Sequence, residues 1–355
     1  MSKKMKSSSR RQQVETDVQI QQERDLNEEL RHNYQAAVRK IIELQRELGL
    51  VRSVERVVLC PGELKPLGRD PSEAVPLLLL SDWHVDEIVL PEAINNLNEY
   101  NLDIAKERVE RVFRSALVIN RMYRGESKIQ RMIVGLLGDF FSGWIHEELM
   151  IASEMAPTES VIKVFEWLIS GLNFLYDEGG FKEIDVVCCT GNHGRITKKR
   201  QYKQRNTKSY EWILYSFLAK WYAADKRRNI KFKLPGGYFN WLEVYGRRIR
   251  FHHGDGIDYR GGVGGIHIPL HKAIAKWNEA NRANLDVMGH WHSSKDDRNY
   301  VINGSVIGYN EYAESKKCDF EEPKQTMLLM HPRYGKTGVF NLVLNANGES
   351  PKKGK

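Results

Sequence analysis

The sequence predicts an α/β fold, and three features of its pattern support this class. Short unbroken apolar runs, typical of strands buried on both faces, recur along the chain. Longer stretches between them repeat their apolar residues at helical spacing. Asp, Asn and His residues stand directly after several of the apolar runs, and α/β proteins bind ligands at the carboxyl ends of their strands. The 355 residues are enough for one large domain or two ordinary ones.

Composition narrows the class of protein further. The chain is 41% hydrophobic and 28% charged, which fits a globular protein with a substantial core. Its net charge of +8 favours an anionic partner, although charge alone does not identify nucleic acid. The cysteines, Cys60, Cys188, Cys189 and Cys318, have no disulfide-framework spacing, so we expect a reducing compartment, the cytoplasm. No apolar run approaches the ~20 residues of a membrane span and the basic start resembles no secretion signal, so no membrane association is expected.

Three segments precede the main domain. Residues 1–13 are basic, rich in serine and free of acidic residues, which predicts a disordered basic arm. Residues 14–52 predict a helix with a seam of apolar residues spaced by four and three, namely Leu30, Tyr34, Ala37, Ile41, Leu44, Leu48 and Val51. This seam predicts either a homo-oligomer or docking on the main domain. Residues 53–74 contain several Pro and Gly and predict a linker, and residues 347–355 predict a short basic tail.

The main domain is expected over residues 75–346 and opens with a buried strand. Asp82 and His84 follow the apolar run Val75–Leu80. They are two residues apart, so an extended backbone would project both to the same side. A carboxylate and an imidazole at one strand end suit a divalent cation, although a capping Asp beside a chance His would leave the same pattern.

A helix and a second strand follow. Residues 104–123 predict an amphipathic helix, because their apolar members fall on one stripe. The apolar run over residues 131–137 predicts a second buried strand, which Gly138 and Asp139 follow. Asp139 is therefore another carboxylate at a strand end, suited to bridging two cations.

A third strand precedes a tripeptide that points to a site. A helix expected over residues 161–176 leads to a strand expected over residues 184–189. Gly191, Asn192 and His193 come after it. Alone, this tripeptide is also explained by a turn with an Asn cap and a surface His. Its place after a third buried strand favours a functional site.

The stretch after this tripeptide is strongly basic. It holds seven cations and no acidic residue, namely Arg195, Lys198, Lys199, Arg200, Lys203, Arg205 and Lys208. Such a run is often a solvated face, but this one begins two residues beyond His193, where a long polyanion entering the site would meet it. Tyr202 and Tyr210 could stack on unpaired bases. We therefore predict Arg195, Lys198, Lys199, Arg200 and Lys203 as substrate-binding residues.

The second half of the domain repeats the arrangement. Its expected elements are a helix over 211–224, a hairpin over 240–245 and 248–252, a helix over 270–281, a strand over 285–288, and closing strands over 300–308, 326–331 and 338–344. The hairpin ends in His252 and His253, and the strand over 285–288 is followed by His290 and His292. Imidazoles two residues apart can each face a different metal of a closely spaced pair.

Taken in order, these strand-end residues resemble the calcineurin-like metallophosphoesterase superfamily. Its pattern is Asp-x-His, Gly-Asp, Gly-Asn-His, a His before Gly, and Gly-His-x-His, and here it spans about residues 75–292. The resemblance implies a four-layer αββα sandwich for this domain, and the predicted N-terminal helix precedes it and lies outside the resemblance. It implies a first metal held by Asp82, His84 and His292, a bridging carboxylate at Asp139, and a second metal held by Asn192, His253 and His290. His193 is implied as the catalytic group that protonates the leaving oxygen or steadies the phosphoryl oxygens.

The implied ligands offer oxygen and nitrogen donors but no thiolate. We therefore expect two divalent metal ions, manganese first, with iron or zinc also suitable. Two such cations about 3.5–4 Å apart can activate water and hold phosphoryl oxygens.

Two departures from the family pattern narrow the function. Gly194 and Arg195 follow Gly-Asn-His, where many members carry a carboxylate that orients the catalytic imidazole. Residues 140–143 stand where protein phosphatases carry Asp-Arg-Gly, which disfavours a protein phosphatase. The chain then more closely resembles the DNA-repair exonuclease (SbcD-like) branch and phage-encoded members of the superfamily.

We predict a phosphodiesterase or nuclease that acts on DNA or RNA with two metals. Two alternatives stay open. One is a phosphomonoesterase or a phosphodiesterase of small nucleotides. The other is a nucleic-acid-binding scaffold with weak activity, which the complete set of ligands disfavours.

Overall fold

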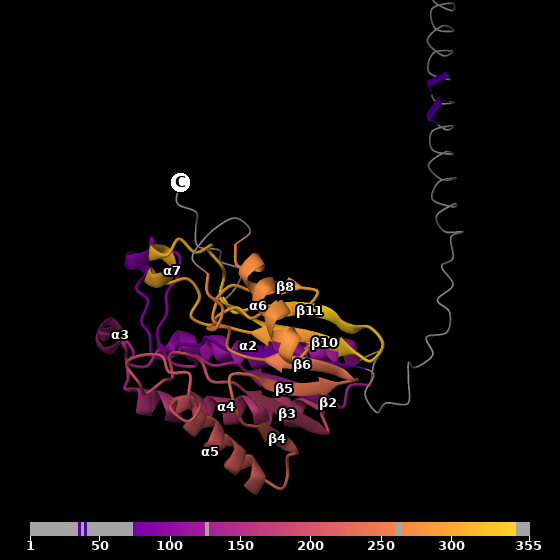
Figure 1. Ribbon diagram of the computed structural model, residues 1–355. Helices are drawn as coiled ribbons and strands as arrows, with labels where there is room; N and C mark the ends of the chain where they lie inside the picture. The colour runs from indigo at the N-terminus through magenta and orange to yellow at the C-terminus, as the bar shows by residue number, and fades with distance from the viewer. Residues whose placement is uncertain (1–34, 37–38, 41–73, 125–127, 260–264, 346–355) are drawn as a thin grey trace, which may run out of the picture. The chain divides into compact units, whose positions relative to one another are not determined.

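The computed structural model describes residues 35–36, 39–40, 74–124, 128–259 and 265–345 (Figure 1). The chain divides into two compact units, Met1–Lys65 and Pro66–Lys355. In the first unit the described residues, Gln35, Ala36, Arg39 and Lys40, are helical. The basic arm, the basic tail and nearly all of the linker and helical seam lie outside the described residues. Pairing of chains through the N-terminal helix therefore stays a prediction.

Two sheets form the centre of the second unit. The larger has six strands in the order β11-β10-β1-β2-β3-β4, and the smaller has five in the order β5-β6-β7-β9-β8. Strands β1 to β4 are parallel, as are β6, β7 and β9, while the other strands pair antiparallel. The strands are β1 (Val75–Leu80), β2 (Arg131–Leu136), β3 (Glu183–Cys188), β4 (Ile230–Lys233), β5 (Asn240–Val244), β6 (Arg247–Phe251), β7 (Leu285–Met288), β8 (Lys295–Asp297), β9 (Tyr300–Ile302), β10 (Lys324–His331) and β11 (Gly335–Val343).

Helices cover the outer faces of both sheets. Figure 1 shows α4 and α5 on the side of the larger sheet, and α6 close to β8 of the smaller one. The helices are η1 (Pro91–Ile94), α2 (Leu102–Arg124), α3 (Glu147–Ala152), α4 (Pro157–Gly179), α5 (Tyr210–Ala224), α6 (His267–Ala280) and α7 (Glu311–Ser315). None of the helices in the described part of the chain is both long and apolar enough to cross a membrane.

Alternation of side chains along the strands creates three cores and so four layers. Leu78 of β1 packs in a core shared with α2, α4 and α5, whereas its neighbour Leu77 belongs to a core shared with β6 and β7. A third core joins Leu270 of α6 to Met288 at the end of β7. The order of layers is therefore helices, larger sheet, smaller sheet, helix. This confirms the predicted αββα sandwich.

The adjacent cysteines illustrate the same alternation. Cys188 lies in the core beneath the helices, and Cys189 lies in the core between the sheets. Both are buried and free, and Cys318 is exposed and free. The thiols of this pair thus act as small core residues, as the sequence predicted.

The structure differs from the predicted elements mainly at edges. Strand β9 ends at Ile302, so most of the expected strand over 300–308 is loop. The edge strands β4 and β8 were not predicted, because IKFK and KDD lack the long apolar runs of the central strands. The short helices α3 and α7 were also missed, and neither buries a residue that would mark one face as apolar.

Candidate metal centre

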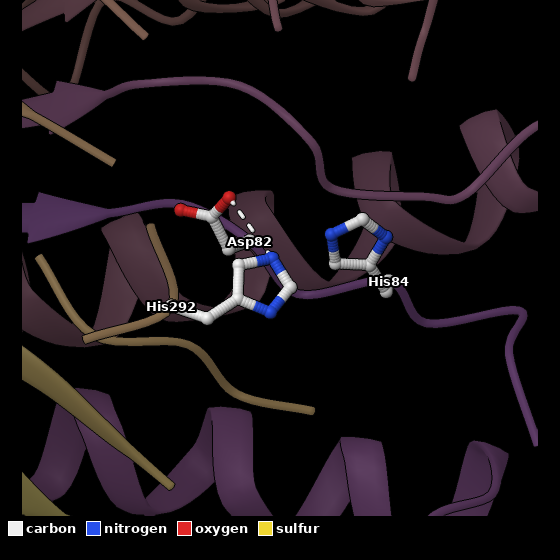
Figure 2. A group of neighbouring side chains, drawn as sticks. All are labelled: Asp82, His84 and His292. Atoms are coloured by element: carbon white, nitrogen blue, oxygen red, sulfur yellow. Dashed lines mark ion pairs between the residues drawn. The ribbon is translucent and has the colours of Figure 1, made fainter. Parts of the chain in front are cut away.

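Three predicted ligands meet where β1 and β7 end. Asp82 and His84 follow β1, and His292 follows β7. Their ligating atoms lie within 4.8 Å of one another, and Nε2 of His292 is 3.4 Å from Oδ1 of Asp82. Figure 2 shows the His292 ring turned toward the Asp82 carboxylate, with the His84 ring beside them. The main-chain N–H of His290 donates to the same carboxylate at 3.0–3.1 Å and holds it in place. We call these three side chains the first group.

A second group of three lies at the ends of β2, β6 and β7. Its members are Asp139, His253 and His290, whose ligating atoms again lie within 4.8 Å of one another. Nε2 of His253 is 2.8 Å from Oδ2 of Asp139 and 3.2 Å from Nδ1 of His290. Oδ1 of Asn192, which follows β3, is 3.1 Å from the same Nε2. The structure thus brings all four residues expected around the second metal to one place.

His252 belongs to a different environment from its neighbour His253. It is buried, its ring centroid lies 5.1 Å from that of Trp277, and its Nε2 is 3.5 Å from Oδ1 of Asp286. His252 therefore lies beside a buried carboxylate and an indole, outside both groups.

Hydrogen bonds on the far side of two imidazoles leave the near nitrogens free to ligate. Nδ1 of His253 lies 2.8 Å from the carbonyl oxygen of Leu137, so Nδ1 carries a proton, and Nε2 is the nitrogen that offers a lone pair when a cation displaces its own proton. Nδ1 of His84 lies 2.8 Å from Oγ of Ser142. Nε2 of His84 is buried and has no hydrogen-bond partner in the described part of the chain. A buried, unpartnered ring nitrogen next to a carboxylate offers a lone pair that a bound cation would accept.

Backbone strain coincides with the two groups. Ten described residues other than glycine have a positive φ, and five of them are the predicted ligands Asp82, His84, Asp139, His290 and His292, with φ from 48° to 73°. This left-handed region is costly for most side chains. Such strain persists where the surrounding structure holds it, and it gathers at functional sites. The sharp turns at the strand ends are therefore part of how these side chains converge.

Two glycines let the loops approach each other closely. A Cβ atom on Gly191 would lie 2.0 Å from Oδ1 of Asp139, and one on Gly289 would lie 2.3 Å from Oδ2 of Asp82. Neither contact is possible for real atoms. The Gly before Asn192 and the Gly before His290 thus leave room for the carboxylate of a different loop.

The charged side chains of the second group shift one another's pKa values. Burial acts to raise the pKa of Asp139, but the charges of His253 and His193 hold it well below its usual value. Burial acts to lower the pKa of His253, but the Asp139 carboxylate raises it to about 10. Burial, and then the charge of His253, lowers the pKa of His290 to about 4. His290 is therefore neutral, which is the form that ligates metals.

In the first group, too, the carboxylate and its neighbouring imidazoles shift one another's pKa values. Burial acts to raise the pKa of Asp82, but its contact with His292 holds the pKa below its usual value. Burial acts to lower the pKa of His292, and the hydrogen bond to Asp82 raises it instead. Burial, and then the nearby imidazoles, lowers the pKa of His84 well below its usual value. His84 is thus the neutral imidazole of this group.

His193 lies beside the first group and is held by the main chain of Ser142. Its ring centroid is 4.8 Å from that of His84, and its Nδ1 is 3.0 Å from the carbonyl oxygen of Ser142. Its main-chain N–H donates to Oδ1 of Asp139 at 2.7 Å. The Ser142 carbonyl thus takes the place of the orienting carboxylate that the sequence lacks after Gly-Asn-His. Because a carbonyl can only accept, Nε2 is the ring atom of His193 left for chemistry.

The basic stretch forms a closed loop over residues 195–209, which we call the strap. Arg195 and Ser209 pair as an isolated bridge at its ends. Arg200 and Arg205 both reach the buried carboxylate of Asp255, at 3.2 Å and 3.1 Å. Asp255 lies two residues beyond His253, so these ion pairs fasten the strap to the loop that carries a predicted ligand.

The predicted substrate-binding residues of the strap divide into two sets. Arg195 donates to the main-chain oxygen of Asn192 at 2.6 Å, and Arg200 pairs with Asp255, so both have partners within the protein. The lysines, Lys198, Lys199 and Lys203, are exposed. Tyr202 is 81% exposed, whereas Tyr210 is half-buried against Phe141. Three lysines and one tyrosine of the strap therefore remain available to a partner.

Glu211 was not predicted as a site residue, yet it lies beneath the second group. It is fully buried at the start of α5 and accepts the main-chain N–H groups of Gly191, at 2.6 Å, and Phe140, at 3.2 Å. Burial, and then the charge of Asp139, raises the pKa of Glu211 to about 7. A Glu in the first turn of a helix is ordinary there, so nothing in the sequence marked it.

Comparisons with known proteins give only distant likenesses. No family model matches the chain, and no curated protein matches it. Among solved structures, Vps29 from Entamoeba histolytica complexed with zinc is 10% identical, with a TM-score of 0.29 over 75% of this chain and 99% of that one. The phosphoesterase Yfce from E. coli is 13% identical, with a TM-score of 0.29 over 76% and 100%. A predicted phosphoesterase from Streptococcus pneumoniae is 11% identical, with a TM-score of 0.26 over 76% and 98%. Function therefore has to be inferred from the geometry of the site.

Proposed function

We propose that the protein is a dinuclear metal-dependent hydrolase of phosphoester bonds. The observation that carries this proposal is the convergence of two Asp-His-His groups at the strand ends of both sheets, with His193 beside them. Paired carboxylate and imidazole ligands without thiolate suit manganese, iron or zinc. Zinc in the Entamoeba Vps29 structure is compatible with this range.

The residues fit two divalent cations. The first group supplies a buried Nε2 of His84 that lacks a protein partner among the described residues, together with the Asp82 carboxylate. The second group supplies Asp139 and His253, with Asn192 adjacent. We assign Asp139 as the bridging carboxylate. Two bound divalent cations would supply an activated water and neutralise charge on a phosphoryl group.

The chain's own residues position the substrate and move one proton. The Ser142 carbonyl orients His193, so that in the charged ring Nε2–H is the atom that can protonate the leaving oxygen. The His193 main-chain N–H fixes the Asp139 carboxylate. Ser142 and Asp139 thus place the proton donor against the phosphoryl site.

We further propose that the substrate is a nucleic acid, with DNA or RNA hydrolysed as by a nuclease. The exposed lysines of the strap and the exposed ring of Tyr202 support this, since they begin a few residues from His193 on a loop that Arg200 and Arg205 fasten in place. Cations bind the phosphate backbone and aromatic rings stack on unpaired bases. The likeness of the motifs to DNA-repair exonucleases belongs to this same proposal.

A side-by-side assay tests the proposal. Metal-depleted full-length protein is given Mn²⁺ and offered bis(4-nitrophenyl) phosphate, 4-nitrophenyl phosphate, and single- and double-stranded DNA. We expect metal-dependent hydrolysis of the diester and of DNA. Preference for the monoester would favour a phosphomonoesterase, and DNA binding without hydrolysis would favour a scaffold. Failure to hydrolyse any of these substrates with Mn²⁺, Fe²⁺ or Zn²⁺ would contradict the proposed reaction class.

A further inference from the structure

Behind the first group lies a buried chain of hydrogen bonds that runs from a carboxylate to a predicted ligand. Oγ of Ser142 is 2.7 Å from Oε2 of Glu87 and 2.8 Å from Nδ1 of His84. Ser142 and His84 are buried, and the Glu87 side chain is 14% exposed. Nδ2 of Asn310 donates to the other Glu87 oxygen at 2.9 Å and fixes this carboxylate.

The direction of every proton in this chain follows from its ends. An ionised carboxylate only accepts, so the Ser142 hydroxyl must donate to Glu87. The hydroxyl oxygen is then left to accept, and Nδ1 of His84 must be its donor. His84 is thereby held with its proton on Nδ1 and its lone pair on Nε2, the buried nitrogen with no partner among the described residues.

We infer that Ser142 and Glu87 are positioning residues that set the metal affinity of the first group through His84. The carboxylate draws the hydroxyl proton, the hydroxyl oxygen draws the Nδ1 proton, and Nε2 becomes a better donor to a cation. Outer hydrogen-bond partners of ligating histidines typically alter metal affinity by about 10–100-fold. The inference rests on the proposed function, since it requires a cation at the first group.

Ser142 has a second role, which its main chain performs. Its main-chain carbonyl accepts Nδ1–H of His193 at 3.0 Å, and its main-chain N–H donates to Oδ1 of Asp86 at 2.6 Å. One residue therefore orients the predicted ligand through its hydroxyl and the predicted proton donor through its main chain. Replacing the side chain with Ala removes only the first of these functions.

The experiment isolates each group before testing the hydroxyl. Two full-length variants are depleted of metal and titrated with Mn²⁺ by calorimetry. His290→Ala disables the second group, and His292→Ala disables the first. Ser142→Ala is then added to each, and Ser216→Ala, whose hydroxyl donates to Trp212 on α5, is the matched control. We expect Ser142→Ala to weaken binding about 10–100-fold with His290→Ala and to leave it unchanged with His292→Ala.

Glu87→Gln provides an independent variant of the same chain. The glutamine amide has one acceptor oxygen, so it cannot accept from both the Ser142 hydroxyl and Nδ2 of Asn310, and we expect the same loss at the first group. Because the two residues act through one path, the double variant should lose no more than either single variant.

The outcomes separate the inference from the proposed function. Equal loss at both groups, no loss at the first group, or additive losses in the double variant would overturn the role of Ser142 and Glu87 while leaving the metal centre intact. If the unsubstituted protein bound none of Mn²⁺, Fe²⁺ and Zn²⁺, the proposed function would be overturned, and this inference with it.

Discussion

The two groups of predicted ligands have the same composition but different support. In the first group, His84 is oriented by hydrogen bonds that run through the side chains of Ser142 and Glu87. In the second group, His253 is oriented by the main-chain carbonyl of Leu137, at the end of a central strand. Burial does not separate the groups, since each has two buried members and one half-buried histidine, His292 in the first and His290 in the second.

This difference indicates which of the two groups can have its metal affinity altered by single substitutions. A main-chain carbonyl survives any substitution that leaves the strand intact, so the second group is determined by the fold itself. A hydroxyl and a carboxylate are each removed by one substitution, so the first group can be adjusted without disturbing the sheets. We therefore expect the affinities of the two groups to respond unequally to mutation.

Asp139→Asn should have the largest effect, because it acts on both groups if Asp139 bridges them. Asn tolerates the left-handed backbone at this position, so the fold should persist. We expect a near-complete loss of diester hydrolysis and fewer than two ions per chain by elemental analysis. The matched variant Asp82→Asn should weaken the first group alone. Near-normal turnover of Asp139→Asn with two bound ions would show that it does not bridge.

His193→Ala should separate metal binding from chemistry. His193 belongs to neither group, so both ions should remain, yet the rate should fall by about 10²–10⁴-fold, as for loss of a general acid. Metal analysis and turnover of the diester, measured on one preparation, check this. If an ion is missing from the first group of this variant, His193 is a ligand and the groups are less alike than their composition indicates.

Neutralising the strap tests whether its lysines contact the substrate. Replacing Lys198, Lys199 and Lys203 with Gln should weaken DNA binding and reduce the salt slope by roughly 0.7–0.9 for each phosphate that is no longer neutralised. Hydrolysis of the small diester should be unchanged, since both groups and His193 are intact. Exposed lysines outside the strap, Lys106, Lys272 and Lys276, give the matched control. Equal effects on both substrates, or on neither, would favour a small substrate.

The predicted ligands could be recognised in the sequence because each follows a strand. Parallel strands bring their carboxyl ends to one edge, so apolar runs followed by Asp, Asn or His were sufficient to group Asp82, Asp139 and Asn192. The residues that orient His84 could not be recognised in the sequence. Ser142 and Glu87 lie 55 positions apart and meet only because the β1 and β2 loops are adjacent.

The strap shows a second limit of sequence reasoning. Its cations looked equivalent as a run of charge, yet the buried Asp255 carboxylate pairs with Arg200 and Arg205 and leaves the lysines free of such ion pairs among the described residues. The pairing depends on the loop after β6, far along the chain. Charge density alone therefore does not show which of these cations pair within the protein.

Glu211 lies beneath the second group, where it accepts the main-chain N–H groups of Gly191 and Phe140. Its folded-state pKa of about 7 lies above the ordinary value of 4.5, so between these values the folded protein binds more protons than the unfolded one. Stability should therefore decline as pH rises through this window, by up to a few kcal/mol from this residue. Glu211→Gln stays neutral and should lack this contribution, so the stability of the variant relative to the unsubstituted protein should rise from pH 5 to pH 8. Urea unfolding of both proteins in chelator measures it. A difference that does not change with pH would mean that the two main-chain N–H donors, from Gly191 and Phe140, outweigh burial and keep Glu211 ionised.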